Sequence, residues 1–222
     1  MKVIIIGAGC VGLSIAYKLL KKFSGNQILV IDRYNVPSKG TSEKNSGVLH
    51  AGLYYPPDSE KSKLCINGHE KLKKLSIDNK LPINQCGKLI IASNKKQLKD
   101  LEKIYKNSIS CNRGVSLIDY SEAKKIQPNV KKAEAYLWSP KTSIFSPKSV
   151  LDFFYNKLLE EGVRFIKDKV DNIDISKKVL TLANNKNIKF NYLFNCAGSG
   201  ALKIFKKTVS SEPSLTILPI LG

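Results

Sequence analysis

Short, fully apolar runs open the chain on either side of a longer helical pattern. Residues 2–6 (KVIII) and 27–31 (QILVI) are continuous apolar runs after one polar residue, which is typical of strands buried on both faces. Between them, apolar residues recur at helical spacing from Cys10 to about Phe23. This order predicts a strand, a helix and a parallel strand, joined by a right-handed crossover.

The middle of the chain mixes helical and strand patterns. Residues 33–58 are irregular and rich in Gly, Ser, Pro and Asn. After them, the spacing predicts a basic helix at 60–78 with Leu64, Leu72 and Leu75 facing inward. The other predicted elements are a strand at 88–93, a helix at 95–108, and strands at 115–119 and 134–138 with a short helix between them.

A helix start marks the last third of the chain. Ser146 is a capping residue and Pro147 suits a first helical position, and apolar residues continue at helical spacing to about Gly162. The run at 192–198 (YLFNCAG) predicts another buried parallel strand. Between them we expect a small antiparallel appendage made of short strands at 163–166, 170–174, 178–182 and 187–190.

The composition is that of an ordinary globular protein with an unusual charge. Of 222 residues, 42% are hydrophobic and 25% charged, and the net charge is +19. The cations are 34 Lys and only 3 Arg, whereas nucleic-acid readers favour Arg for its bidentate contacts with phosphate and guanine. We therefore expect solvated helix faces rather than a nucleic-acid interface. The positive field would attract an anionic substrate or an anionic membrane surface.

Cysteine usage and hydropathy indicate the compartment. The five cysteines contain no C-x-x-C pair and no regular spacing, a pattern that indicates reduced thiols and neither a disulfide framework nor a metal site. No stretch of about 18 apolar residues occurs, so we expect no transmembrane segment. The sequence predicts a cytoplasmic protein, with peripheral contact on the inner membrane face as a further option.

The glycines after the first strand carry the clearest chemistry. Gly7-x-Gly9-x-x-Gly12 lies between a predicted strand and a predicted helix. The first glycine permits the tight turn, the second lets the backbone approach a pyrophosphate, and the third lets helix and sheet pack closely. Asp32 ends the second strand, twenty residues after Gly12, where a carboxylate accepts hydrogen bonds from a ribose. The motif predicts a dinucleotide site and does not separate NAD from FAD; the alternative is a Gly-rich turn in an ordinary βα unit.

These elements predict an α/β fold in which a doubly wound FAD/NAD(P)-binding Rossmann-like domain carries an inserted α+β substrate domain. We expect the first domain at 1–82 and 146–206, and a partial second domain at 83–145 and 207–222. The last residues, LTILPILG, resemble a strand just beginning. The sequence therefore predicts a chain truncated at its C-terminus.

The segment 41–55 (TSEKNSGVLHAGLYY) lies just past the second strand, where the extended body of a flavin dinucleotide would run. Here the chain resembles the D-amino-acid-oxidase-like superfamily of FAD-dependent oxidoreductases and, within it, the L-2-hydroxyglutarate dehydrogenase/oxidase family. The matching stretches, spread along nearly the whole chain, are NSGVLHAGLYYPP (45–57), KSKLCINGHEKL (61–72), INQCGKLIIAS (83–93), the region around TSIFSPKSV (142–150) and FNCAG (194–198).

The resemblance implies FAD as the cofactor and hydride transfer from a hydroxylated carbon to the flavin ring. It further implies that Ser46, Gly47 and His50 lie near that ring, and that the backbone of Val170 holds the adenine. With the glycine motif, the full set of expected FAD-binding residues is Gly7, Gly9, Gly12, Asp32, Arg33, Thr41, Ser42, Asn45, Ser46, Gly47, Val170, Ala197 and Gly198.

His50 is the candidate catalytic residue. It is one of two histidines, and an imidazole accepts a hydroxyl proton near neutral pH because its ordinary pKa lies there. The alternative is a structural histidine held in a loop. The other histidine, His69, falls within the basic helix, and we expect it to be a surface or capping residue. Cys196 fits a small core residue better than a nucleophile.

The resemblance implies an FAD-dependent dehydrogenase or oxidase acting on a small 2-hydroxy acid, with L-2-hydroxyglutarate as the leading candidate and oxygen or a membrane quinone as electron acceptor. Departures from the family, such as Lys44 where His is common and Asp32 where Glu is frequent, concern the substrate more than the flavin. The alternatives are an amine oxidase or glycerol-3-phosphate dehydrogenase of the same superfamily, a tRNA-modifying flavoprotein, and a non-catalytic remnant.

Overall fold

The computed structural model describes residues 1–34, 40–111 and 113–208 and forms two compact units. One unit comprises Met1–Asn45 and the chain from Pro147 onwards, and the other comprises Ser46–Ser146. Residues 46–82, which we assigned to the first domain, thus have most of their contacts with the second unit. Of the residues assigned to the end of the partial domain, 209–222 lie outside the described residues.

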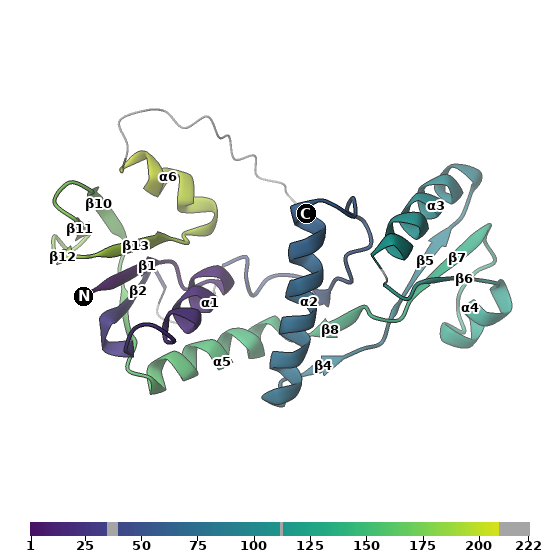
Figure 1. The fold of residues 1–222 in the computed structure, drawn as a ribbon, viewed down its shortest axis with the longest axis horizontal. Coiled ribbons are helices and arrows are strands. Elements are labelled where there is room, and N and C mark those ends of the chain that lie inside the picture. The colour runs from purple at the N-terminus through teal and green to yellow at the C-terminus, as the bar shows by residue number, and fades with distance from the viewer. Residues whose placement is uncertain (35–39, 112, 209–222) are drawn as a thin grey trace. The chain divides into compact units, whose positions relative to one another are not determined.

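A four-stranded parallel sheet forms the centre of the first unit (Figure 1). Its strands, in the spatial order β13-β1-β2-β9, are β13 (Tyr192–Asn195), β1 (Val3–Ile6), β2 (Ile28–Asp32) and β9 (Arg164–Lys167). The predicted parallel βαβ opening is confirmed. The assignment of 163–166 to an antiparallel appendage is wrong: β9 pairs parallel with β2, in a register that places Phe165 opposite Val30.

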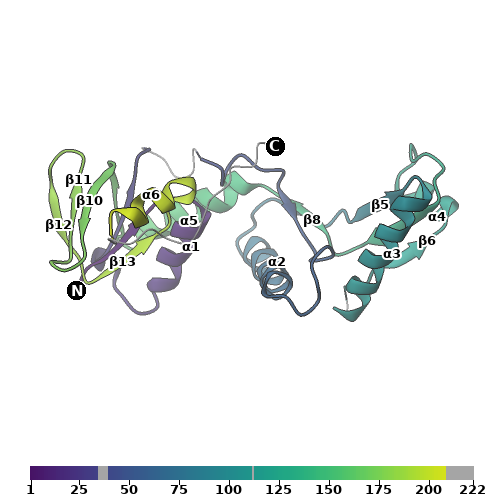
Figure 2. The ribbon, with the colours of Figure 1, turned by 90° about the horizontal axis from the view of Figure 1, so that it is seen from above.

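Two different layers cover the sheet. Val3 and Ile5 pack against the helices α1 (Cys10–Leu19) and α5 (Pro147–Glu160). Ile4 and Ile6 point the other way, toward the antiparallel strands of a second sheet. Those strands are β10 (Val170–Asp174), β11 (Val179–Leu182) and β12 (Asn187–Lys189), seen side by side in Figure 2. Because both faces are covered, β1 is apolar at every position.

The first unit departs from the prediction at two helices. α1 ends at Leu19 rather than near Phe23, because the chain turns back toward β2 through Gly25. Gly25 lies so close to the neighbouring backbone that a Cβ there would be 1.7 Å from the carbonyl oxygen of Glu161. A short helix that the apolar pattern did not predict, α6 (Ala201–Lys206), follows β13 and packs Ile204 against the second face.

The second unit contains an antiparallel sheet between two helices. The two helices lie on either side of the sheet (Figure 1). Leu137 packs with the buried Leu101 of the helix α3 (Lys95–Ser110), whereas the adjacent Tyr136 packs with Ala123 of the helix α4 (Tyr120–Ile126). This alternation along one strand is what period-two burial predicts. The elements are β5 (Lys88–Ala92), β7 (Ala135–Ser139) and β6 (Ser116–Ile118) in that spatial order, with α3 (Lys95–Ser110) and α4 (Tyr120–Ile126).

A smaller sheet and a long helix complete the second unit. The helix α2 (Glu60–Asp78) has the predicted bounds, but one of the three leucines predicted to face inward is misplaced: Leu64 is 68% exposed, whereas Leu72 and Leu75 are partly buried. The fully buried positions are Ser62, His69 and Ser76, every seventh residue, so α2 packs through small and polar side chains. The sheet, which the sequence did not predict, consists of β3 (Val48–Leu49), β8 (Ser143–Phe145) and β4 (Ile83–Asn84) in that spatial order.

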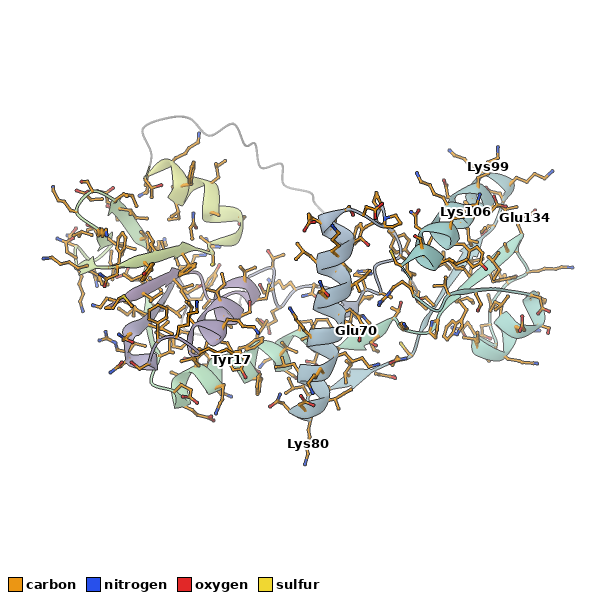
Figure 3. All side chains as sticks on the ribbon, in the orientation of Figure 1. Tyr17, Glu70, Lys80, Lys99, Lys106 and Glu134 are labelled. Atoms are coloured by element: carbon orange, nitrogen blue, oxygen red, sulfur yellow. The ribbon has the colours of Figure 1, made fainter. Side chains whose placement is uncertain are left out.

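Exposed lysines decorate the helices of the second unit. Figure 3 shows Lys80 projecting from the end of α2, and Lys99 and Lys106 lie on the exposed face of α3. None of the helices in the described part of the chain is long and apolar enough to cross a membrane. These lysines thus lie on solvated surfaces of the second unit.

Candidate functional site

The glycine motif forms the predicted turn between β1 and α1. Gly7 has a φ of +105°, and a Cβ on it would lie 2.3 Å from the carbonyl oxygen of Cys196. A Cβ on Gly12 would lie 1.9 Å from the carbonyl oxygen of Gly7. Neither position tolerates a side chain, so the loop backbone lies directly against the sheet and the helix. Gly9 is the N-cap of α1 and has no side chain to cover the helix end.

Residues 41–45 lie over the N-terminus of α1. The backbone N–H of Cys10 donates to the hydroxyl of Ser42 at 3.0 Å, and the amide nitrogen of Asn45 donates to the carbonyl of Ser42 at 2.9 Å. Ser42 is close enough that a Cβ on Gly9 would be 2.9 Å from its hydroxyl oxygen. Thr41 is the exposed neighbour of Ser42. The segment thus lines the end of the helix that carries unpaired N–H groups and a positive partial charge.

Asp32 braces the glycine loop. One carboxylate oxygen accepts from the N–H of Ala8 at 2.7 Å, and the other accepts from the N–H of Tyr34 at 2.9 Å. Each oxygen retains a lone pair for a further donor such as a ribose hydroxyl. The guanidinium of the exposed Arg33 lies 5.0 Å from the ring centre of Tyr34.

Two chain segments return to the same edge of the sheet. Cys196, directly after β13, donates its N–H to the carbonyl of Ile6 at 2.8 Å, which brings Ala197 and Gly198 beside the end of β1. Asp168 donates its N–H to the carbonyl of Asp32, so Val170 starts β10 close to the end of β2. The Cys196 side chain packs against the helix-side core, and burial raises the pKa of its thiol, which is unfavourable for a nucleophile.

The first unit therefore gathers the features that the adenosine diphosphate part of a dinucleotide needs. The carboxyl ends of β1, β2 and β13 meet at one edge because the strands are parallel. That edge offers a side-chain-free loop at Gly7 and Gly9, the N-terminus of α1 for the phosphates, and the Asp32 carboxylate for a ribose. The glycine loop, the N-terminus of α1 and Asp32 therefore fit the adenosine diphosphate part of FAD. Among the described residues no cluster of His, Cys, Asp and Glu suits a metal ion.

The remaining predicted residues belong to the second unit. Gly47, with a φ of +65°, accepts at its carbonyl from the N–H of Phe145 at 2.8 Å and precedes the short strand β3. Ser46 is exposed. His50 is also exposed and follows β3 directly. At Gly52, φ is +81° and a Cβ would lie 2.9 Å from the side chain of Ile66, so the loop that carries His50 lies tightly against α2.

Side chains from distant positions hold the backbone of this loop. The carbonyl of His50 accepts from Nδ1–H of His69 at 3.2 Å and from the thiol of Cys65 at 3.6 Å, and the carbonyl of Ala51 accepts from Nε of Arg113 at 2.6 Å. Arg113 is 4% exposed and lies 3.7 Å from the carboxylate of Glu70, which is labelled on α2 in Figure 3. The loop is therefore fixed by hydrogen bonds as well as by its glycines.

The prediction that His69 is a surface or capping residue is wrong. Its side chain is 2% exposed, because it lies on the polar inward face of α2. Burial lowers the pKa of His69, and the charges of Glu70, which raises it, and Arg113, which lowers it, act more weakly. Sequence reasoning also missed Arg113. The signal available was its rarity, since this lysine-rich chain has only 3 arginines.

A small hollow lies beside His50. It has room for about one water molecule. The ammonium of Lys88 donates to the hydroxyl of Tyr54 at 2.6 Å, and Lys88 and Thr142 are lining residues that the sequence did not single out.

Partial burial lowers the pKa of His50, and the positive charge of Lys88 lowers it further. The imidazole is therefore neutral near pH 7, as a general base must be. The hollow is lined by residues 50–55, Lys88 and Thr142.

Comparison with solved structures supports this fold. The chain is similar to glycine oxidase from Geobacillus kaustophilus (TM-score 0.83, 17% identity, 93% of this chain and 57% of that one). It is also similar to L-proline dehydrogenase from P. horikoshii (TM-score 0.79, 21% identity, 93% of this chain and 55% of that one). At these identities the likeness concerns the fold alone.

Sequence comparison gives relatives with one name. The chain is 33% identical over 193 residues to the mitochondrial L-2-hydroxyglutarate dehydrogenase of Dictyostelium discoideum, covering 85% of this chain and 41% of the relative. It is 28% identical over 224 residues to the L-2-hydroxyglutarate dehydrogenase of Indibacter alkaliphilus, covering 100% of this chain and 56% of the relative. The chain thus spans about half the length of these relatives. The model of the DAO family, FAD-dependent oxidoreductases, matches residues 2–222, and the chain belongs to that family.

Proposed function

We propose that this chain is the cofactor-binding part of an FAD-dependent dehydrogenase or oxidase that acts on a small 2-hydroxy acid, with L-2-hydroxyglutarate as the leading substrate. The observation that carries the proposal is the loop at Gly7–Gly9–Gly12, where the backbone leaves no space for a side chain at Gly7 or Gly12 and the N-cap of α1 is the glycine Gly9. The names of the curated relatives support the substrate class.

Each part of the first unit has a role in this proposal. The glycine loop and the N-terminus of α1 receive the diphosphate, and Asp32 accepts from a ribose hydroxyl. Ser42 and Asn45 hold their segment over the helix end. The further residues that we assign to FAD are Arg33, Thr41, Ser46, Gly47, Val170, Ala197 and Gly198.

His50 supplies the proton transfer. Bound FAD supplies the hydride acceptor. Oxidation of a hydroxylated carbon to a carbonyl also releases the hydroxyl proton, and a ring nitrogen of neutral His50 takes it. The lowered pKa of His50 favours this neutral form. The backbone contacts from His69 and Arg113 leave the His50 ring itself available for the proton.

The partners follow from the reaction. The substrate is a small anion, which the net charge of +19 would attract. Oxygen or a membrane quinone accepts the electrons. A cytoplasmic location, with peripheral contact on the inner membrane face as the second option, stays a prediction, as does the absence of nucleic-acid binding.

The test uses the full-length protein. It should purify with FAD, identified by chromatography after denaturation, and L-2-hydroxyglutarate should bleach the flavin absorbance when mixed without oxygen. NAD in place of FAD, or no cofactor, would refute the cofactor assignment. Flavin reduction by an amine or by glycerol 3-phosphate, with none by 2-hydroxy acids, would assign the protein to another branch of the family.

A further inference from the structure

Lys88 is a cation beside His50 to which the mechanism above gives no role in binding. It opens β5 and lines the same small hollow as His50. Its ammonium lies 4.7 Å from the ring centre of Tyr54 and donates to the hydroxyl of that tyrosine at 2.6 Å. Within the described parts of the chain, no salt bridge involves Lys88.

Lys88 and Tyr54 together have hydrogen-bond donors that are not used within the described chain. A lysine ammonium has three N–H donors, and one of them is used by Tyr54. Because the Tyr54 oxygen accepts that bond, its own O–H hydrogen is available to a further acceptor. Two ammonium hydrogens and one phenol hydrogen therefore lie together with a full positive charge and no carboxylate of the described chain. This donor set is complementary to a carboxylate oxygen.

The position of Lys88 is fixed by its neighbours. Lys88 pairs with Ser139 of β7, and the preceding Gly87 donates its N–H to the carbonyl of Thr142 at 3.0 Å. The ring of Trp138 lies so close to Gly87 that a Cβ there would be 2.0 Å from it. The cation thus extends from a backbone that cannot shift easily, which is the property of a binding group placed in advance.

The size of the hollow limits what enters it. With room for about one water molecule, it can receive an oxygen of a ligand. His50 lines the same hollow, so an oxygen bound to Lys88 lies next to the proposed base. In a 2-hydroxy acid the carboxylate and the hydroxyl are on neighbouring carbons, which matches this adjacency.

We propose that Lys88 and Tyr54 bind the carboxylate next to the reacting carbon and so make the site specific for hydroxy acids. The inference rests on the proposed function, which it deepens by naming the residues that recognise the substrate class. Lys88 contacts the substrate, and Tyr54 donates a second hydrogen bond and orients the ammonium.

The test compares full-length holoproteins. We use glutarate, which has the carboxylates and lacks the hydroxyl, as a non-reacting probe, and we follow its binding by calorimetry. Lys88→Met should weaken glutarate and L-2-hydroxyglutarate binding about 10- to 100-fold, whereas Lys88→Arg keeps most of the affinity. Lys124→Met is the matched control, because Lys124 also lies over a tyrosine ring, at 5.7 Å from the ring centre of Tyr120 in the same unit. The glutarate affinity of the Lys124→Met protein should equal that of the parent.

The outcomes separate the two proposals. Unchanged glutarate affinity in Lys88→Met, or an equal loss in Lys124→Met, overturns the role of Lys88 even when the parent oxidises L-2-hydroxyglutarate. Glutarate binding that depends on Lys88, in a parent that oxidises no 2-hydroxy acid, overturns the proposed function and supports the carboxylate site. If Lys88→Met does not fold, Tyr54→Phe removes one donor without a charge, and its binding loss should be smaller and its melting temperature unchanged. Parent-like affinity in Tyr54→Phe would then overturn the inference.

Discussion

The two compact units build their sites from different kinds of contact. In the first unit, the turn between β1 and α1 is shaped by close backbone approaches, of Gly12 to Gly7 within the βαβ segment and of Gly7 to Cys196 after β13. In the second, side chains hold the loop at His50: His69 is 19 positions away along the chain from the carbonyl that it binds, and Arg113 is 62 positions away from its own acceptor, Ala51.

This difference predicts how each site responds to change. A site made of backbone contacts accommodates a new side chain poorly, because the added Cβ meets a backbone carbonyl and not a side chain that can rotate away. A site made of side-chain hydrogen bonds loses them one at a time, each with a limited free-energy cost. Substitutions in the first unit should therefore abolish cofactor binding outright, and those in the second should give graded effects.

The largest effect is expected for Gly12→Val in the full-length protein. Its Cβ would lie 1.9 Å from the carbonyl oxygen of Gly7, so α1 must move away from the loop that receives the diphosphate. We expect no bound FAD, measured by chromatography of the denatured protein, and a lower free energy of unfolding by at least about 1–3 kcal/mol.

Gly68→Ala is the matched control. Gly68 lies within α2, and nothing lies within 4 Å of the place its Cβ would occupy. Here the added methyl group should stabilise the protein by about 0.5–1 kcal/mol, because glycine is unfavourable inside a helix. A Gly12→Val protein that keeps its FAD would show that the close approach is relieved at little cost, and the contrast between the units would fail.

The next largest effect is expected for His50→Ala. Removal of a general base slows the chemical step by about 10²–10⁴-fold, which corresponds to about 3–5 kcal/mol in the barrier. Rapid mixing with L-2-hydroxyglutarate in the absence of oxygen measures the rate of flavin reduction. FAD content should equal that of the parent, because the diphosphate loop lies in the other unit.

Two results would change the role of His50. Loss of FAD in His50→Ala would mean that the histidine holds the cofactor or its loop. Flavin reduction at the parent rate would mean that another residue of the full-length protein takes the proton. His50→Gln adds a check, since an amide keeps a polar side chain but cannot accept the proton, and it should be as slow as His50→Ala.

The local parts of the fold could be predicted from the sequence. The apolar runs of β1 and β2, and the Gly7–Gly9–Gly12 spacing, depend on residues that are neighbours along the chain. The bounds of α2 were also predicted. For β1 and β2, the apolar pattern reflects burial of the strand on both faces. For the glycine spacing, the pattern reflects a backbone that leaves no space for side chains at Gly7 and Gly12.

The remaining features depend on partners that no local pattern identifies. β3 and β8 pair Val48 with Ile144 in a sheet of very short strands. The sequence pattern of β9 is like that of the antiparallel strands after it, and only its parallel pairing with β2 distinguishes it from them. His69 was misassigned because an apolar period indicates Leu64 as the inward face of α2, whereas the helix buries Ser62 and Ser76. The backbone contacts of Arg113 leave no mark in the sequence beyond the residue itself.

A moderate effect on stability is expected for Arg113→Met. The substitution keeps much of the buried volume and leaves the carbonyl of Ala51 without its donor, which costs about 1–3 kcal/mol in the free energy of unfolding. We expect the lower part of this range. Nη2 of Arg113 is buried without a hydrogen-bond partner among the described residues, and the substitution removes the free-energy cost of burying that unpaired donor. Chemical denaturation measures the change.

Glu70→Gln separates the hydrogen bond from the ion pair. Glu70 is 58% exposed and 3.7 Å from Arg113, so the substitution should change the free energy of unfolding by no more than about 1 kcal/mol. If Glu70→Gln destabilises the protein as much as Arg113→Met does, the charge pair and not the Ala51 contact holds the loop.

The smallest effect concerns the pH dependence of flavin reduction. The pKa of His50 lies below its ordinary value of 6.5, first because of partial burial and second because of the charge of Lys88. The base form reacts, so the second-order rate of flavin reduction, which reports on the substrate-free protein, should fall as the pH falls through a value below 6.5. Lys88 is the charged group of the described chain that shifts this pKa, and Lys88→Met should move the inflection upward. The rise of the pKa should be partial, because the burial of His50 remains.

Melting temperatures at each pH separate this effect from acid unfolding, to which the buried His69 contributes. The pKa of His69 is lowered in the folded protein, so the stability that its neutral form provides is lost as the pH falls below 6.5. An inflection that stays in place or moves downward in Lys88→Met, with an unchanged melting temperature, would show that the Lys88 charge does not act on His50.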